Sequence, residues 1–290
     1  MDMKGFLRRH ALPEHYAAIA QQWFMPLGEE IASHQKSAKQ TFFVGVNGCQ
    51  GSGKSTLCDY LVDYLIQEHN LNCISLSLDD FYLDQSARNA LAIKVHPLLK
   101  TRGVPGTHDV ALANQTFDKL ASFGTVSIPR FDKSTDNPFP VSQWPITNGP
   151  VDVVIVEGWC WGVSAQLDNA LNEPVNDLES EQDSLGTWRR YVNRQIKEHY
   201  QSLFDRMDYW AMLKGPSFEH VYKWRCEQEH KLAKQSNGAA VMSDDQIASF
   251  IQHYQRLTEH CLESLPDKCD TVFELDENRQ ISHVQKKATA

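Results

Sequence analysis

A glycine-rich segment, GVNGCQGSGKSTLCDYL at positions 45–61, constrains the fold of this chain more than any other feature. Gly48, Gly53, Lys54 and Ser55 fit the pattern G-x-x-x-x-G-K-[ST]. A β-branched and aromatic run, TFFVGVN at 41–47, precedes the pattern, and leucines at helical spacing follow it. The pattern therefore stands in the context that it requires, between a buried strand and a helix.

The residue types in this loop suit the binding of phosphate groups. Glycines let the backbone curl so that successive N–H groups point at phosphate oxygens, and the start of the helix adds its positive end. Lys54 supplies a point charge to the β- and γ-phosphates, and Ser55 offers a hydroxyl to magnesium. A glycine-rich turn that matches by chance is the alternative. The segment predicts ATP and Mg²⁺ as cofactors, with these nucleotide-binding residues: Gly48, Cys49, Gln50, Gly51, Ser52, Gly53, Lys54, Ser55 and Thr56.

Strand-like and helix-like segments alternate along the rest of the chain. Strands are predicted at 73–78 (CISLSL), at VSI (126–128), at 151–156 (VDVVIV), and within YWAML and TVFEL, with a helix near 109–122. This order implies an α/β fold, the three-layer α/β/α P-loop NTPase arrangement with a mainly parallel central sheet. We expect a helical segment over 1–40 that packs on a P-loop domain over 41–290, and a solvated loop over the acidic residues 172–184.

Charge and composition narrow the classes of function. The formal charge of −9, from 37 acidic and 28 basic residues, argues against nucleic acid or an acidic membrane surface as the main partner. No run approaches the roughly 20 apolar residues of a membrane-spanning helix. The seven cysteines include no C-x-x-C pair and indicate reduced thiols. We expect a cytoplasmic protein, monomeric or homodimeric, that acts on a small molecule.

Two carboxylates follow the predicted strand at 73–78. Asp79 and Asp80 should emerge at the carboxyl edge of the sheet, beside the phosphate loop. A carboxylate there accepts the proton of an acceptor hydroxyl or orients that hydroxyl for in-line attack. The alternative is that both aspartates only cap a turn or a helix. We expect Asp79 and Lys54 to be catalytic, and Asp80 and Tyr82 to contact the acceptor.

An acidic residue also ends the most apolar strand. Glu157 follows VDVVIV, where a carboxylate can hold magnesium directly or through water. A solvent-facing strand end is the alternative. With the phosphate loop alongside, the metal role is favoured, and we expect Ser55 and Glu157 to hold Mg²⁺.

These segments together resemble the branch of P-loop kinases that includes uridine kinase, phosphoribulokinase and bacterial pantothenate kinase. GCQGSGKST, SLDDFYL, RGVPGTHD, RFDKS and VIVEGW are similar to segments of the plant-type D-glycerate 3-kinase family and its ATP-binding relatives in yeast and bacteria. The resemblance runs from about residue 41 to about residue 281. It implies that the phosphate loop binds ATP, that Asp79 activates the acceptor and that Glu157 lies near magnesium.

The chain departs from this resemblance after Lys133. Relatives continue from DKS into a glycine-rich run ending near GDR, whereas this chain reads DKSTDNPFPVSQWP. We expect this loop near the acceptor, so the departure weakens the glycerate assignment and leaves the kinase assignment intact.

Basic residues mark a candidate acceptor site. RGVPGTHD places Arg102 and His108 around a turn, RFDK adds Arg130 and Lys133, and Arg225 lies on a predicted helix. Arginine offers two parallel donors to a carboxylate, which suits an acceptor such as glycerate. The alternatives are ion pairs or backbone contacts for the arginines and a helix cap for the histidine.

The sequence therefore predicts an ATP-dependent small-molecule kinase, with D-glycerate as the first candidate acceptor. A kinase for a nucleoside or a pantothenate-like alcohol is one alternative. A nucleotide-dependent switch or ATPase, whose conformational change a protein partner reads, is the other.

Overall fold

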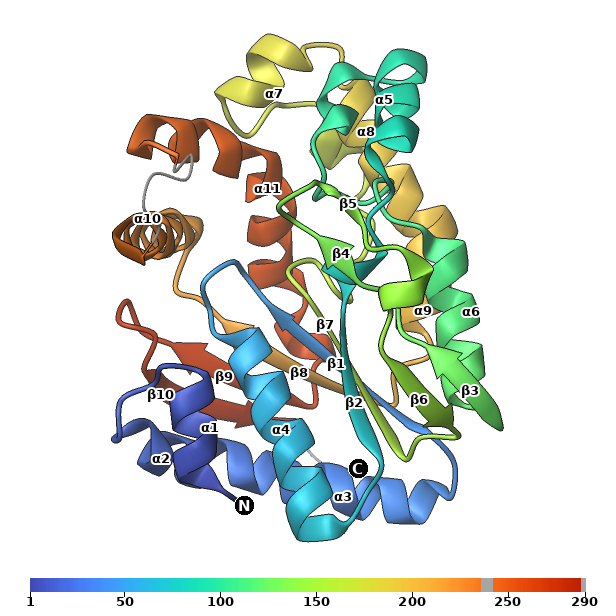
Figure 1. Cartoon of the computed structure of the whole chain (residues 1–290). Coiled ribbons are helices and arrows are strands. Elements are labelled where there is room, and N and C mark those ends of the chain that lie inside the picture. Colours follow the sequence, from blue (N-terminus) through green and yellow to red (C-terminus); the bar gives the residue numbers. More distant parts are fainter. Residues whose placement is uncertain (236–241, 288–290) are drawn as a thin grey trace.

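The computed structural model describes residues 1–235 and 242–287. Its central sheet has the strand order β10-β9-β8-β1-β7-β2 (Figure 1). Neighbouring strands run parallel, except that β10 is antiparallel to β9. The mainly parallel sheet predicted from the sequence is thereby confirmed. The strands are β1 (Phe42–Gly48), β2 (Cys73–Ser77), β7 (Val153–Gly158), β8 (Tyr209–Lys214), β9 (Thr271–Leu275) and β10 (Ile281–Lys286).

Helices cover both faces of this sheet. Successive side chains of β1 point to opposite faces, so their contacts show which helix covers each face. Phe42 stacks on His34 with ring centroids 5.9 Å apart, whereas Phe43 packs on Phe117 at 5.7 Å. One face carries α3 (Met25–Ala38) and α4 (Lys54–His69), and the other carries α6 (Val110–Leu120), α9 (Gln201–Phe204) and α11 (Asp244–Ser264). Within the described ranges, none of the helices combines the length and the apolar character needed to cross a membrane.

Further helices surround the carboxyl ends of the strands. α10 (Phe218–Gln235) follows β8 directly, and α5 (Gln85–Lys94) follows the short helix η2 (Leu78–Phe81) at the end of β2 (Figure 1). After residue 40, the chain also forms the helices η3 (Pro97–Lys100), η4 (Val141–Gln143), η5 (Asp168–Leu171), α7 (Asp177–Gln182), α8 (Thr187–Gln195), η6 (Ile196–Tyr200) and η7 (Pro266–Lys268).

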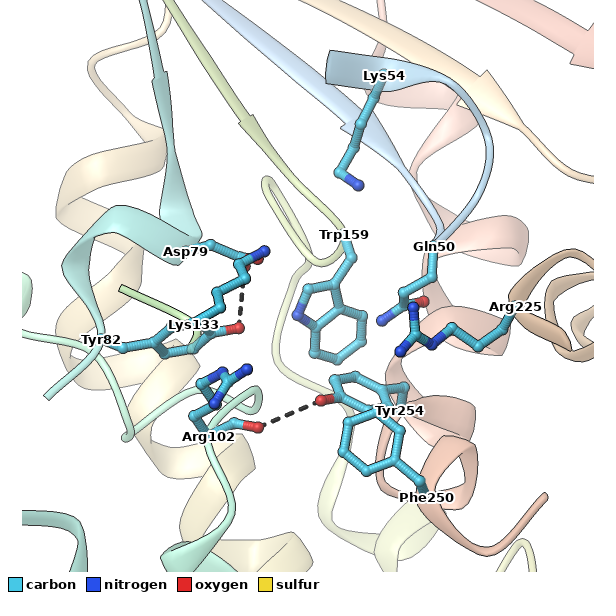
Figure 2. A pocket seen from close by; sticks show the side chains of 10 residues that line it. All are labelled: Gln50, Lys54, Asp79, Tyr82, Arg102, Lys133, Trp159, Arg225, Phe250 and Tyr254. Atoms are coloured by element: carbon cyan, nitrogen blue, oxygen red, sulfur yellow. Dashed lines mark hydrogen bonds and ion pairs between the residues drawn. The ribbon is translucent and has the colours of Figure 1, made fainter. Parts of the chain in front are cut away.

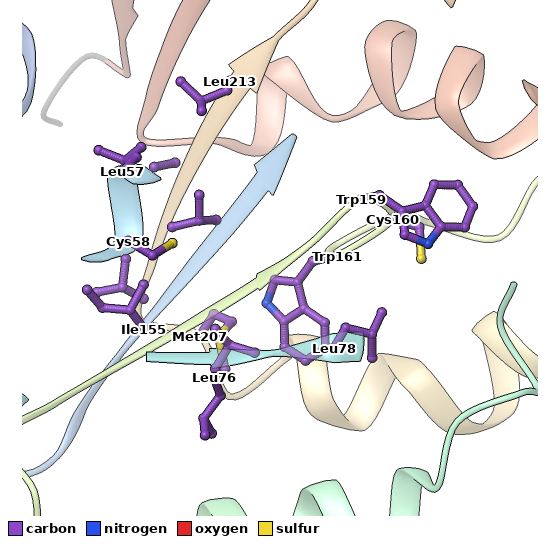
Figure 3. Close-up of a cluster of buried hydrophobic side chains, with 14 of the residues drawn as sticks. Leu57, Cys58, Leu76, Leu78, Ile155, Trp159, Cys160, Trp161, Met207 and Leu213 are labelled. Atoms are coloured by element: carbon purple, nitrogen blue, oxygen red, sulfur yellow. The ribbon is translucent and has the colours of Figure 1, made fainter. Parts of the chain in front are cut away.

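The core lies between the sheet and its helices. Val153, Val154, Ile155 and Val156 are fully buried, as expected for a central strand that is covered on both faces. Figure 3 shows part of this core, where Leu57 and Cys58 of α4 and Ile155 of β7 belong to the same cluster of buried side chains.

The N-terminal residues join the same apolar core. They form α1 (Met3–Arg9), α2 (Tyr16–Ile19), η1 (Ala20–Phe24) and α3. Phe6 packs edge-on against Tyr60 of α4, and Phe24 packs edge-on against Phe273 of β9 at 5.8 Å. The helices predicted over 1–40 therefore pack on the sheet domain, and a domain boundary at residue 40 stays a prediction.

The predicted strand VSI lies outside the central sheet. β3 (Gly124–Ser127) pairs with β6 (Ile146–Gly149) in a separate antiparallel ribbon. A second small ribbon joins β4 (Phe131–Asp132) to β5 (Asn137–Pro138). The two ribbons bracket the loop that follows Lys133.

The prediction of a solvated loop over 172–184 is wrong. Residues 177–182 form α7, and the side chains of Glu179 and Asp183 are both buried. Glu179 pairs with Arg256 of α11 at 2.6 Å, and Asp183 pairs with Arg189 of α8 at 3.1 Å. Acidic composition suggested exposure, but each buried carboxylate has an arginine partner, 77 residues away for Glu179 and six residues away for Asp183, and the residue pattern alone does not reveal these pairs.

Candidate active site

The carboxyl ends of β1, β7 and β2 meet at one edge of the sheet. The strand register aligns Val46 and Ser77 with Glu157, so the phosphate loop, Asp79 and Glu157 all emerge within a few residues of the same level. This is the edge at which open parallel sheets bind their ligands.

The phosphate loop has the backbone that anion binding needs. Gly51 and Gly53 have φ angles of +79° and +91°, which are accessible to glycine and costly for other residues. α4 begins at Lys54, and no side chain caps its first turn. The N–H groups at this helix start are therefore available to phosphate oxygens.

Helix α10, which is distant in sequence, packs against the phosphate loop. A Cβ atom placed on Gly51 would lie 2.9 Å from the Cβ of Trp224, so only glycine fits against α10 here. The indole of Trp224 donates a hydrogen bond to the carbonyl of Glu277 at 2.9 Å. Through this indole, α10 links the phosphate loop to the turn between β9 and β10.

Ser55, Lys54 and Glu157 form a polar group beside the loop. The Ser55 hydroxyl donates to Oε1 of Glu157 at 2.8 Å, and the Lys54 ammonium lies 3.8 Å from Oε2. Burial favours neutral Lys54, but the carboxylates of Glu157 and Asp79 outweigh it and raise the pKa of the lysine. Lys54 is therefore a cation when nucleotide arrives.

The same group fits a magnesium ion. Oε2 of Glu157 is buried and accepts no hydrogen bond from the described residues, so this hard oxygen atom can coordinate a metal ion. The described residues hold no cluster of three or more acidic, histidine or cysteine side chains suited to a metal. Magnesium at phosphate sites needs only one or two protein oxygens, because phosphate and water supply the others. Ser55 and Glu157 offer that number.

A cavity of about 180 Å³ opens in front of these residues. Figure 2 shows Lys54 entering it from the phosphate loop, with Asp79 and Lys133 on one side and Gln50 and Arg225 on the other. The lining consists of Gln50, Lys54, Asp79, Tyr82, Arg102, Lys133, Trp159, Arg225, Phe250 and Tyr254.

Asp79 is the carboxylate of this cavity. Its Oδ2 accepts a hydrogen bond from the Lys133 ammonium at 2.6 Å, and its Oδ1 accepts one from the Tyr82 hydroxyl at 2.9 Å. Burial works toward a higher pKa of Asp79, but Lys133, Lys54 and the Tyr82 hydroxyl together outweigh it, so the pKa lies below the ordinary value of an aspartate. Asp79 is therefore an anion at neutral pH.

Asp80, Arg130 and His108, which were predicted to contact the acceptor, lie outside the lining of this cavity. Asp80 accepts from the backbone N–H of Ser77 in a capping box and pairs with Arg130 at 3.0 Å. His108 is buried, stacks on Tyr82 with ring centroids 4.5 Å apart and bonds to the hydroxyl of Tyr200 at 2.6 Å. Burial lowers the pKa of His108 to about 3, so its ring is neutral.

The predicted arginines of the cavity have internal partners as well. Arg102 pairs with Asp136 through one terminal nitrogen, and Arg225 pairs with Glu229 one helical turn away at 2.7 Å. Asp136 belongs to the divergent loop after Lys133, and it also pairs with the buried Arg88 at 2.7 Å. The sequence did not single out Asp136, because its partners lie 34 and 48 residues away.

An aromatic wall of the cavity also escaped prediction. Trp159 donates to the carbonyl of Gly103 at 3.1 Å, and Tyr254 donates to the carbonyl of Arg102 at 3.2 Å. The two rings pack edge to face at 4.9 Å. Trp159 stands two residues after Glu157, and Phe250 and Tyr254 are four residues apart on α11, so strand-end position and helical spacing were the available clues.

Comparison with known proteins places this site in a family. No family model matches the chain. An uncharacterized kinase of Schizosaccharomyces pombe is 33% identical over 272 residues, which cover 86% of this chain and 93% of that kinase. The chloroplastic D-glycerate 3-kinase of Arabidopsis thaliana is 28% identical over 241 residues, which cover 78% of this chain and 50% of that protein.

The likeness extends to three-dimensional structure. The D-glycerate 3-kinase of Cryptococcus neoformans superposes with a TM-score of 0.78 at 26% identity, covering 93% of this chain and 99% of that one. These relatives confirm the P-loop kinase resemblance predicted from the sequence. The chain therefore belongs to the P-loop kinase family that contains the D-glycerate 3-kinases and the Schizosaccharomyces kinase.

Proposed function

We propose that this kinase transfers the γ-phosphoryl group of ATP to a hydroxyl group of a small metabolite, and that D-glycerate is the first acceptor to test. One observation carries the proposal: Lys54 of the phosphate loop and Asp79 after β2 line the same small cavity. The names of the Arabidopsis and Cryptococcus relatives support D-glycerate as the first acceptor.

The phosphate loop holds the donor in this proposal. The N–H groups from Gly48 to Thr56 surround the phosphates of ATP, and the Lys54 ammonium neutralises charge on the β- and γ-phosphates. Ser55 and Glu157 hold Mg²⁺, which, when bound, neutralises charge on the phosphate oxygens.

Asp79 orients the acceptor. Because its pKa is lowered, the carboxylate is a weak base that accepts a hydrogen bond from the acceptor hydroxyl and directs the oxygen at phosphorus. The bond from the acceptor oxygen to γ-phosphorus forms as the bond to the bridging oxygen of ADP breaks. The hydroxyl proton passes to Asp79 late in the transfer and then to solvent.

The cations of the cavity suit an acidic acceptor. Arg102 uses one terminal nitrogen on Asp136 and keeps its other N–H groups for a ligand. With Lys133 and Arg225 on the same lining, a carboxylate of the acceptor finds charged donors while its hydroxyl faces Asp79. In this proposal Tyr82 fixes the direction of the Asp79 carboxylate.

Release of ADP by the purified protein with ATP and Mg²⁺, with and without D-glycerate, tests the proposal. Lys54→Ala is the contamination control. We expect glycerate-dependent ADP release that is lost in Lys54→Ala. Asp79→Asn should bind ATP as the unaltered protein does but turn over about 10²–10⁴ times more slowly.

Two results would contradict the proposal. Unchanged turnover by Asp79→Asn would remove Asp79 from the mechanism. ADP release that is fast without any acceptor, and lost in Lys54→Ala, would favour an ATPase or a switch.

A further inference from the structure

A second cavity adjoins the acceptor cavity on the side away from the phosphate loop. Its volume is about 500 Å³, and it shares Arg102, Arg225 and Phe250 with the first cavity. Figure 2 shows Arg102 and Phe250 on the part of the first cavity remote from Lys54, and Arg225 beside Gln50. The far walls of the second cavity come from α5, from the residues after η3 and from Asp136.

The two volumes differ in what they can hold. The first cavity has a volume of about 180 Å³ and the second a volume of about 500 Å³. The second cavity holds more than twice as much. Because the two cavities share lining residues, an acceptor whose hydroxyl faces Asp79 has room to extend into the second cavity.

The charge of the second cavity is positive. Its lining carries the cations Arg88, Lys100, Arg102 and Arg225 and a single carboxylate, Asp136. Arg88 and Arg102 both pair with Asp136, so that carboxylate is already neutralised, and Arg225 pairs with Glu229 outside the lining. The Lys100 ammonium has no carboxylate within 4.0 Å in the part of the chain that the structure describes.

The guanidinium of Arg88 makes the wall of this cavity rigid. It is buried and donates to the backbone carbonyls of Leu83, Lys100 and Asp136 at 2.8–3.1 Å. Arg88 therefore fixes the backbone of Lys100 and Asp136 relative to α5. The side chains of Gln85, Asn89 and Thr101 add amide and hydroxyl groups of the kind that bind hydroxyl groups of a ligand.

We propose that the second cavity is a subsite for a second anionic group, so that this kinase accepts hydroxy acids longer than glycerate that carry a carboxylate or a phosphate at their far end. Lys100 is the principal cation of the subsite, and Arg102 lies between the two cavities. This inference rests on the proposed function, because it takes the first cavity to hold the acceptor hydroxyl.

Binding of a matched series of six-carbon acids tests the subsite. D-Gluconate ends in a neutral hydroxyl, D-glucarate in a second carboxylate and 6-phospho-D-gluconate in a phosphate. A four-carbon pair, D-erythronate and tartrate, covers the shorter spacing. Affinities are measured by calorimetry on the full chain saturated with ADP and Mg²⁺, for the unaltered protein, for Lys100→Met and for Lys94→Met, whose exposed lysine lies outside the cavity lining.

We expect at least one acid with a carboxylate or a phosphate at its far end to bind about tenfold more tightly than its neutral-ended partner, a difference of about 1.4 kcal/mol. This preference should disappear in Lys100→Met and persist in Lys94→Met. Preference for glucarate or for phosphogluconate tells carboxylate from phosphate as the natural group.

The failures of the two proposals can be told apart. Equal affinity for acids with a neutral far end and for acids with a charged far end would overturn the subsite alone. A preference for the charged far end that survives in Lys100→Met would do the same. Absence of binding by every acid, D-glycerate included, would overturn the acidic acceptor of the proposed function and the subsite with it.

Discussion

The Lys133 ammonium lies 2.6 Å from Oδ2 of Asp79, while the Tyr82 hydroxyl donates to Oδ1 at 2.9 Å. Both oxygens of the candidate catalytic carboxylate therefore have a donor before any acceptor binds. Burial alone would raise the pKa of Asp79, and Lys133, with smaller contributions from Lys54 and the Tyr82 hydroxyl, keeps this carboxylate ionised.

Replacement of Lys133 by methionine should make activity sensitive to acid. The pKa of Asp79 is lowered in the folded protein, so the anion persists as pH falls and is lost only below the usual range of aspartate. Without the ammonium, only Lys54 and the Tyr82 hydroxyl oppose the effect of burial, so the pKa of Asp79 rises. We expect kcat of Lys133→Met to decline at a higher pH than kcat of the unaltered protein.

The pH profile of kcat from 5 to 8 measures this effect, with Lys133→Arg as the charge-preserving control. An acid limb at the same pH in Lys133→Met and in the unaltered protein would show that Lys133 does not set the ionisation of Asp79. A change in KM alone would assign Lys133 to acceptor binding.

Loss of the Ser55 hydroxyl should raise the requirement for magnesium. Ser55 and Glu157 already share a hydrogen bond of 2.8 Å, and their oxygens are the hard ligands at this strand end. We expect Ser55→Ala to need a higher Mg²⁺ concentration for half-maximal ADP release, while Ser55→Thr behaves as the unaltered protein does. An equal magnesium requirement in the alanine and threonine variants would remove this hydroxyl from the metal site.

Local sequence was sufficient to predict the site residues that lie at the end of a strand or in the loop after it. The phosphate loop begins at Gly48, the last residue of β1, Asp79 follows β2, and Glu157 lies near the carboxyl end of β7, so strand order places them at one edge. Asp136 and Tyr254 were missed, because their place in the two cavities depends on partners far away in the sequence. The helical spacing of Phe250 and Tyr254 does not reveal that the Tyr254 ring packs against Trp159.

His108 shows the same limit for a residue that was singled out. Its neighbours in RGVPGTHD suggested an acceptor contact, whereas the fold buries it between Tyr82 and Tyr200. A neutral buried histidine couples folding to pH. Its pKa is about 3 in the folded protein and about 6.5 in an unfolded chain, so below about pH 6.5 the unfolded state binds a proton that the folded state does not.

Stability should therefore fall as pH falls from 6.5 toward 3, by up to about 1.4 kcal/mol per pH unit from this one group. Denaturant unfolding at pH 7, 6 and 5 measures the slope. His108→Phe should be less stable at pH 7 but should lose less stability on acidification. Comparison of slopes separates the titration from the lost contact with Tyr200, and an equal slope in the two proteins would contradict the assignment.

The buried ion pair between Glu179 and Arg256 should carry much of the stability of α11. Both oxygens of Glu179 accept from Arg256, at 2.7 and 2.6 Å, and the arginine also donates to the carbonyls of Ala170 and Glu173. Glu179→Gln leaves the guanidinium buried without its counter-charge. We expect the free energy of unfolding to fall by about 3–5 kcal/mol.

The expected loss of stability depends on burial of the ion pair, so a solvent-exposed ion pair is the matched control. Glu219 pairs with Lys223 one turn away on α10 at 2.7 Å, but both side chains are more than half exposed. Solvent screens such a pair, and Glu219→Gln should leave the unfolding free energy unchanged within error. Because α11 carries Phe250 and Tyr254, Glu179→Gln should also raise KM for the acceptor under conditions where the variant is still folded. Equal stability losses in the two variants would mean that burial of Glu179 does not govern the strength of its ion pair.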